Sequence, residues 1–160
     1  MFKFYDVDAN YIHYLQQFEP KVPRVEYSNN SKFVCGVVLS INDIDYYAPV
    51  SHFNKPQQTN FPIRHKGNVI STIRFCFMFP AISEVLHEID FAKIAITDLP
   101  YAQLLNIEYE YCKINIDNIL SKATKVYTMG TNPEDWNYRN CCNFKLLEQH
   151  YKDYNSSVTY

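Results

Sequence analysis

The sequence predicts an α+β domain with a mostly antiparallel β-sheet. Two observations carry this prediction. Runs rich in β-branched and aromatic residues lie before residue 100, whereas the apolar residues after about residue 101 follow a helical period. Strands early and helices late are typical of a chain whose helices cover an antiparallel sheet. Since no internal repeat or linker divides the chain, we expect a single domain over residues 1–160.

The first segments predict a short strand followed by a short helix. Residues 2–7, FKFYDV, alternate as a strand does. In the next segment Tyr11, Leu15 and Phe18 lie at helical spacing, and Asp8 or Asn10 is the expected N-cap. The prolines and the Asn-Asn-Ser cluster of EPKVPRVEYSNNS then predict a loop.

The middle of the chain predicts a β-hairpin and further strands. In KFVCGVVLSINDIDYYAPV two β-rich runs flank Asn42 and Asp43, residue types that suit a tight turn. A polar loop is expected over SHFNKPQQTNFP, and NVISTIRFCFMFPAI predicts a strand that ends at Pro80. FAKIAITDL fits one more strand, with a helix as the alternative.

The last third predicts one long helix and a shorter one. Apolar residues recur at spacings of 4, 3, 4, 3, 4 and 3, at Leu105, Tyr109, Cys112, Ile116, Ile119, Ala123 and Val126. Gly130, Asn132 and Pro133 are expected to end this long helix. NFKLLEQHYKDY predicts the shorter helix, and the residues after it are expected to fray.

Composition excludes several classes of protein. Three glycines could hardly form a phosphate-binding loop, and the scattered carboxylates disfavour a two-metal nuclease. Five cysteines without CxxC or CxxH spacing support neither a disulfide framework nor a zinc site, so buried free thiols are expected. No run has the apolar length of a signal peptide core or a membrane span, which predicts a soluble, cytoplasmic protein.

The 14 tyrosines have two interpretations. Tyrosines pack well at the edge of a core, and they also stack on the bases of nucleic acids. The net charge of −2 argues against a surface coated in positive charge, but a local basic face remains compatible with it.

The stretch YYAPVSHFNKPQQ, residues 46–58, is the candidate catalytic site. A strand-like run ends there, and Ser51, His52 and Lys55 follow within five positions. Cleavage of RNA by its own 2′-hydroxyl needs a base, an acid and cations that stabilise the phosphorane, and these side chains can fill those roles. An ordinary polar loop is the alternative.

Basic residues on both sides of this stretch predict a positive face that binds RNA. They are Lys21, Arg24, Lys32, Arg64, His65, Lys66 and Arg74. A solvated loop surface explains the same residues without any function.

The ordered motifs of the N-terminal third resemble the ToxN/AbiQ family of type III toxin–antitoxin systems, and within it the CptN group. They are FYDVDANYIHYLQQFEPKVP, with its tyrosine-rich helix and Lys-Val-Pro loop, and KFVCGVVLSINDIDYYAPVS, with its hairpin and turn. The later NILSKATKVY also fits the family pattern. The resemblance covers most of residues 2–130.

The resemblance implies a metal-independent endoribonuclease toxin without a cofactor. Its fold would be a twisted, mostly antiparallel sheet flanked by helices, similar to that of the MazF/Kid toxins. Its partner would be a repeated antitoxin RNA that the toxin cuts into pseudoknots. Toxin and RNA would alternate in a closed, head-to-tail assembly. Other substrates would be cellular or phage RNA, which implies a role in phage defence by abortive infection, and no membrane is implied.

The resemblance also implies roles for individual residues. Lys55 and Lys32 would stabilise the transition state, and Ser51 and Tyr27 would orient the scissile phosphate. His52 stands where the family usually has serine, and it is a candidate general acid or base because imidazole titrates near neutral pH. A non-catalytic RNA-binding module and a purely structural or protein-binding domain are the alternatives.

Overall fold

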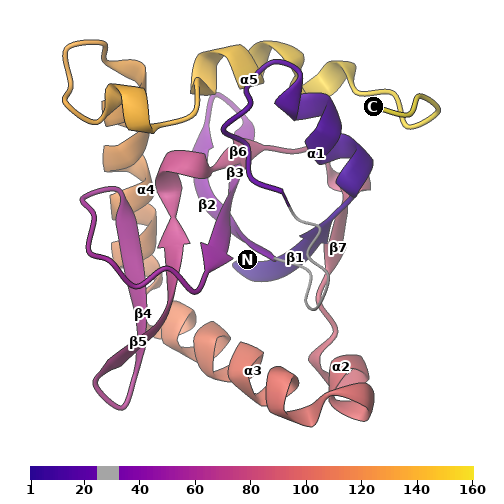
Figure 1. Cartoon of the computed structure of the whole chain (residues 1–160), viewed down its shortest axis with the longest axis vertical. Coiled ribbons are helices and arrows are strands. Elements are labelled where there is room, and N and C mark those ends of the chain that lie inside the picture. Colours follow the sequence, from indigo (N-terminus) through magenta and orange to yellow (C-terminus); the bar gives the residue numbers. More distant parts are fainter. Residues whose placement is uncertain (25–32) are drawn as a thin grey trace.

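The computed structural model describes residues 1–24 and 33–160, which form an α+β fold with an antiparallel sheet of long and short strands (Figure 1). The strands are β1 (Lys3–Val7), β2 (Val34–Ile41), β3 (Ile44–Ser51), β4 (Asn60–His65), β5 (Asn68–Arg74), β6 (Phe79–Pro80) and β7 (Leu86–Glu88). The helices are α1 (Ala9–Gln16), α2 (Phe91–Thr97), α3 (Leu99–Ile114), α4 (Ile116–Thr131) and α5 (Phe144–His150).

The strands of the described part form one sheet in the order β4-β5-β3-β2-β1-β7, with β6 paired to β3. Each of these pairings is antiparallel, which confirms the predicted sheet. Two tight hairpins organise it. Asn42 and Asp43 connect β2 to β3 at φ values of 51° and 61°, as predicted, and Lys66 and Gly67 connect β4 to β5 at 49° and 79°. Positive φ at both central residues is the geometry that joins twisted strands with two residues.

Three predictions for the middle of the chain were incomplete. Part of the expected polar loop is strand β4, whose six residues pair with β5. The strand expected up to Pro80 ends at Arg74, where a 3₁₀ turn over Phe75–Phe77 precedes the short β6. FAKIAITDL forms helix α2, so the helical alternative was correct.

The prediction of a single long helix was wrong, because the helix is interrupted between α3 and α4. Asn115 leaves the helical conformation at φ −103° and ψ 17°, and its side-chain amide donates to the carbonyl of Tyr111 at 2.9 Å. The apolar period continues across the break because both helices bury one face against the same core. Figure 1 shows the two helices running in different directions, with α3 below the sheet and α4 beside β4 and β5.

The C-terminal region packs more closely than the sequence suggested. Gly130 lies inside the last turn of α4 rather than beyond it, and a Cβ there would come within 2.3 Å of the ring of Phe144. The expected fraying of the last residues was also wrong. The side chain of Asn10 in α1 donates to the carbonyl of Val158 at 2.7 Å and accepts from the backbone N–H of Tyr160 at 2.8 Å.

The five cysteines are buried free thiols, as expected. Among the residues that the structure describes, no helix is long and apolar enough to cross a membrane.

Candidate catalytic and RNA-binding site

Ser51 and His52 lie where β3 leaves the sheet. Ser51 is the last residue of β3 and pairs with Thr72 of β5. Two side chains then tie the following loop to β5. The Thr72 hydroxyl donates to the carbonyl of Phe53, and Nδ1 of His52 lies 3.3 Å from the carbonyl oxygen of Ile70. Because β5 is an inner strand of the sheet, the start of the loop is held by a rigid element.

Ser51 also belongs to a cluster of buried polar atoms without hydrogen-bond partners. Over residues 1–24 and 33–160 there are four such side-chain atoms: Ser51 Oγ, Asn60 Oδ1, Ser71 Oγ and Arg74 Nε. All four lie on β3, β4 or β5. Buried polar atoms in native proteins are almost always hydrogen-bonded. These exceptions lie on three adjoining strands next to the candidate loop.

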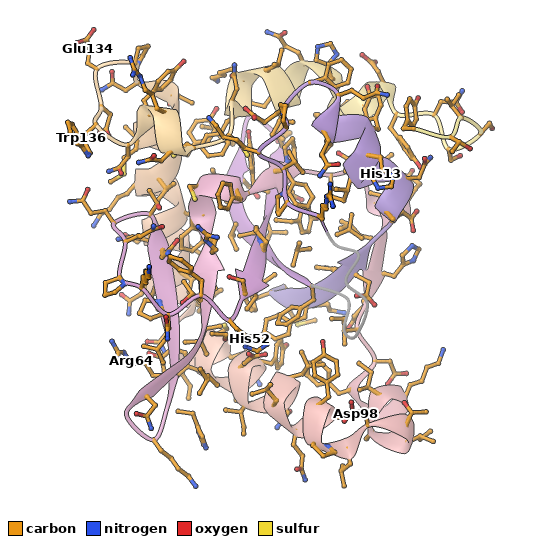
Figure 2. The ribbon with its side chains drawn as sticks, viewed as in Figure 1. His13, His52, Arg64, Asp98, Glu134 and Trp136 are labelled. Carbon is orange, nitrogen blue, oxygen red and sulfur yellow. The ribbon has the colours of Figure 1, made fainter. Side chains whose placement is uncertain are left out.

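Glu108 of α3 brings a buried carboxyl to the same region. Its side chain is only 2% exposed. Burial raises the pKa of this carboxyl, and the Ser71 hydroxyl and the nearby His52 ring partly oppose the rise. Ser71 faces the carboxyl at a geometry too poor for a normal hydrogen bond. In Figure 2, His52 lies between the end of β3 and α3. A carboxyl of raised pKa beside an imidazole can hold or move a proton.

Lys55 and Arg64 supply positive charge on the other side of the same strand end. Together with Asn60 and Thr72, they line a pocket of about 110 Å³ between the loop and the β4–β5 hairpin. Ser71 and Thr72 are neighbours in β5, so their side chains point to opposite faces of the sheet. The cationic pocket and the Glu108 carboxyl therefore lie on opposite faces, and both adjoin the end of β3.

Arg74 is held rigidly at the far end of β5. Its guanidinium carbon lies 4.4 Å from the centre of the Phe53 ring and 4.6 Å from that of Phe77. Both rings present their faces to the cation, an arrangement that fixes the guanidinium without neutralising it.

The other predicted RNA-binding residues are spread more widely. His65 and Lys66 lie at the tip of the β4–β5 hairpin, roughly 20 Å from Arg74 at 3.3 Å per strand residue. Figure 2 shows Arg64 on the outer side of this hairpin. Lys21 is exposed, and its ammonium group donates to the carbonyl of Cys141 at 2.9 Å. The cationic residues therefore form a band along the hairpin rather than one compact patch.

Three predicted residues lie at or beyond the edge of the described structure. Arg24 is exposed at the end of the first described range. Tyr27 and Lys32 lie outside the described residues, so their predicted roles stay predictions.

Sequence reasoning missed Glu108. The apolar face was assigned through Tyr109, but the residues of α3 that are buried are Ala102, Leu105, Glu108 and Cys112. Glu108 follows Leu105 by three positions and precedes Cys112 by four, so it lies on the buried stripe of the helix. A carboxylate at that spacing was the available signal. In the described part of the chain, no three His, Cys, Asp or Glu side chains come together in a way that could hold a metal ion.

Comparison with known proteins gives one consistent result. A family model described as the toxin ToxN of type III toxin–antitoxin systems matches residues 3–152. The chain is 30% identical over 165 residues to the endoribonuclease ToxN of Pectobacterium atrosepticum, covering 95% of this chain and 93% of that protein. It is 28% identical over 175 residues to the endoribonuclease AbiQ of Lactococcus lactis subsp. lactis, covering 99% of this chain and 92% of that protein.

Solved structures agree with the sequence matches. A toxin structure from work on selective toxin inhibition by a non-coding RNA pseudoknot has a TM-score of 0.86 at 27% identity, over 97% of this chain and 98% of that chain. The structure of AbiQ, a lactococcal anti-phage endoribonuclease of the type III toxin–antitoxin class, has a TM-score of 0.82 at 27% identity, over 96% of this chain and 98% of that chain.

Proposed function

This chain belongs to the ToxN family of type III toxin–antitoxin toxins, and from that membership we propose that it is a metal-independent endoribonuclease that cuts RNA at the end of β3. The observation that carries the proposal is that two groups of side chains adjoin the end of β3: His52 with the buried Glu108 carboxyl, and, on the opposite face of the sheet, the pocket lined by Lys55 and Arg64. Relatives of similar length and fold are named endoribonucleases.

The proposed reaction is an intramolecular transesterification. A base removes the proton from a ribose 2′-hydroxyl, and the 2′-oxygen attacks the adjacent phosphorus. The bond between phosphorus and the 5′-oxygen breaks, and an acid protonates the leaving oxygen. The products are a 2′,3′-cyclic phosphate and a 5′-hydroxyl. The proposed reaction needs no oxidant, reductant or metal.

His52 fits the proton-transfer role by its geometry. When Nδ1 carries the proton and donates it to the Ile70 carbonyl, Nε2 is free to accept another proton. Glu108 would stabilise the imidazolium that forms, because a nearby carboxylate favours a protonated histidine. Its burial keeps water from screening that interaction.

Ser51 and Lys55 fit the role of holding the scissile phosphate. The Ser51 hydroxyl has no partner within the described protein and can donate to a phosphate oxygen. Lys55, with Arg64 in the same pocket, would offset the extra negative charge of the phosphorane. Tyr27 and Lys32 remain predicted members of this site.

The proposed partner is a repeated antitoxin RNA that folds into pseudoknots, which the toxin cuts and which then inhibits it. Solved relatives come from work on selective toxin inhibition by a non-coding RNA pseudoknot and on a processed non-coding RNA that regulates an antiviral system. We propose that toxin and RNA alternate in a closed assembly in the cytoplasm, and that phage and cellular RNAs are the other substrates. The MazF/Kid likeness of the fold remains part of this proposal.

The test is cleavage of a single-stranded, A-rich RNA in excess EDTA by the wild type and by Lys55→Ala. Lys93→Ala is the matched control, because Lys93 is exposed on α2, far from the β4–β5 hairpin in Figure 1. We expect cleavage and a 2′,3′-cyclic phosphate from the wild type and the control. Lys55→Ala should lose at least about 100-fold in rate while it still binds antitoxin RNA.

Two results would count against the proposal. Full activity in Lys55→Ala would remove this lysine from the site. Binding without cleavage by the folded wild type, on RNAs of varied sequence, would favour the non-catalytic RNA-binding module instead.

A further inference from the structure

A second pocket lies beside the proposed cleavage site. It has a volume of about 390 Å³, within the ~300–1,000 Å³ range of small-ligand pockets. Its lining includes Gln57, Arg74, Phe77, Trp136, Asn137 and Asn140. One wall is the end of β5 and the loop that carries Lys55, and the other is the turn that follows α4.

Trp136 is unusual because it is almost fully exposed on a well-fixed turn. It is 91% exposed, although large aromatic side chains are usually mostly buried. The turn around it is held by hydrogen bonds: the N–H of Asp135 donates to the Asn132 carbonyl at 3.0 Å, and the N–H of Asn137 donates to Oδ1 of Asp135 at 2.8 Å. An exposed indole on a fixed turn is a ready stacking surface.

The turn is also tied directly to the candidate catalytic loop. The side-chain amide of Asn137 donates to Oε1 of Gln58 at 2.8 Å. Gln58 lies three residues after Lys55 in the sequence. The two walls of the pocket are therefore fixed relative to one another and to the loop that carries Lys55.

The chemistry of the lining fits one unpaired nucleotide of RNA. Arg74 lies between Phe53 and Phe77, and its buried Nε has no hydrogen-bond partner among residues 1–24 and 33–160. Its guanidinium is therefore oriented, and no side chain of these residues forms an ion pair with it. Such a group suits a phosphate or a base edge. The side-chain amides of Gln57 and Asn140 carry both donors and acceptors, and Oδ1 of Asn137 can accept, so the lining can match the edge of a base.

The charged residues around the pocket indicate how the base and the phosphate of the nucleotide would be oriented. Glu134 and Asp135 precede Trp136 in the turn and disfavour a phosphate on that side. Figure 2 shows Glu134 pointing away from the sheet, whereas Trp136 lies on the side nearer β4 and the loop. The base therefore belongs against Trp136 and the phosphate against Arg74.

We propose that Trp136 and Arg74 form a subsite for one unpaired base of RNA, next to the nucleotide that is cut. The inference rests on the proposed function in that its ligand is the same RNA. It extends that function because Trp136 and Arg74, which take no part in the proposed cleavage chemistry, would position the RNA. Stacking is tolerant of sequence, and the amides add a preference for the base that they can pair with.

Trp136 is the only tryptophan in the chain, so its fluorescence reports on this pocket alone. The probes are short 2′-O-methyl oligonucleotides of adenosine, cytidine and uridine, which cannot be cleaved through the 2′-oxygen. We expect saturable quenching of the tryptophan emission, strongest with the base that the amides prefer. Quenching does not require cleavage, so this readout is independent of catalysis.

Variants provide the second measurement, by anisotropy of the same oligonucleotides carrying a dye. Trp136→Ala should weaken binding about tenfold, the usual effect of losing one base stack. Tyr138→Ala is the matched control, since Tyr138 is a partly exposed aromatic of the same turn outside the pocket lining, and its affinity should be unchanged. Thermal melts should show that both variants are folded, because neither side chain is part of the core.

The outcomes separate this inference from the proposed function. Quenching without cleavage of natural RNA would support the subsite and refute the catalysis. Cleavage without quenching, or unchanged affinity in Trp136→Ala, would refute the subsite and leave the catalysis standing.

Discussion

The Ser51 hydroxyl has no hydrogen-bond partner in the described part of the chain, and we expect it to lower the stability of the free protein and to contribute to its function. An unsatisfied buried polar group costs about 1–3 kcal/mol, and Ser51→Ala removes the group. Alanine is the poorer strand residue by a few tenths of a kcal/mol, so the net gain should be about 1 kcal/mol. For a chain of this length that gain raises the melting temperature by about 2–4 °C.

The same substitution should slow RNA cleavage. If the hydroxyl donates to the scissile phosphate, its loss removes a charge-assisted hydrogen bond of about 1.5–3 kcal/mol. This corresponds to a fall of roughly 10- to 100-fold in kcat/KM. The prediction is therefore a variant that is more stable and less active.

Calorimetry and cleavage of a labelled RNA would test both halves. Ser40→Ala is the matched control on β2, because the Ser40 hydroxyl is exposed and already donates to Asp45. It should lose a few tenths of a kcal/mol and keep full activity. A lower melting temperature for Ser51→Ala would show that the hydroxyl is satisfied in the free protein. Unchanged cleavage would refute its contact with the phosphate.

Two further predictions concern carboxyls with little exposure to solvent: Glu108, which is buried, and Glu148, whose side chain is 13% exposed. Burial raises the pKa of Glu108, so the folded protein binds its proton more tightly than the unfolded chain does, and wild-type stability falls as pH rises above the ordinary value of 4.5. In Glu108→Gln this fall should be absent, so the melting temperature of the variant minus that of the wild type should grow from pH 4 to pH 7. Cleavage by the variant should drop about 100-fold. A melting-temperature difference that stays constant with pH would refute the raised pKa of Glu108. Glu148 accepts hydrogen bonds from the hydroxyls of Tyr46 at 2.8 Å and Tyr127 at 2.7 Å. Glu148→Ala should therefore lower the free energy of unfolding by about 3–5 kcal/mol and the melting temperature by roughly 10 °C. Glu110→Ala, which removes one partner of an exposed ion pair, should change the free energy of unfolding by less than about 0.5 kcal/mol. Equal melting temperatures for the two variants would contradict the importance of the tyrosine–carboxylate network.

The sequence predicted elements whose signals are local and missed those that depend on tertiary contacts. The β2–β3 hairpin followed from two alternating runs and a turn that tolerates positive φ. Strand β4 was hidden because polar residues and Pro62 occupy one face of an edge strand, where neither is costly. The break at Asn115 left no trace in the apolar spacing, since the buried face resumes directly at the start of α4.

The residues of the candidate site also divide into those with a local sequence signal and those placed by tertiary contacts. Ser51, His52 and Lys55 could be predicted because they are close in sequence and follow a strand end. Glu108 left only the signal of a carboxylate on an apolar helical stripe, and Trp136 left none, because both reach β3 and its loop only through the packing of α3 and the turn after α4. Residues of one site that come from distant segments leave no common pattern in a single sequence.

The tyrosines also bear on which side chains bind RNA. Of those that the structure describes, Tyr138 alone is exposed, and the others are buried or half-buried. Several use their hydroxyls within the fold: Tyr11 donates to the Pro80 carbonyl at 2.7 Å, and Tyr14 donates to the His150 carbonyl at 2.7 Å. A hydroxyl satisfied in this way and a ring packed in the core cannot also stack on a base. The aromatic composition therefore reflects the core, and base stacking belongs to the exposed Trp136 beside Arg74.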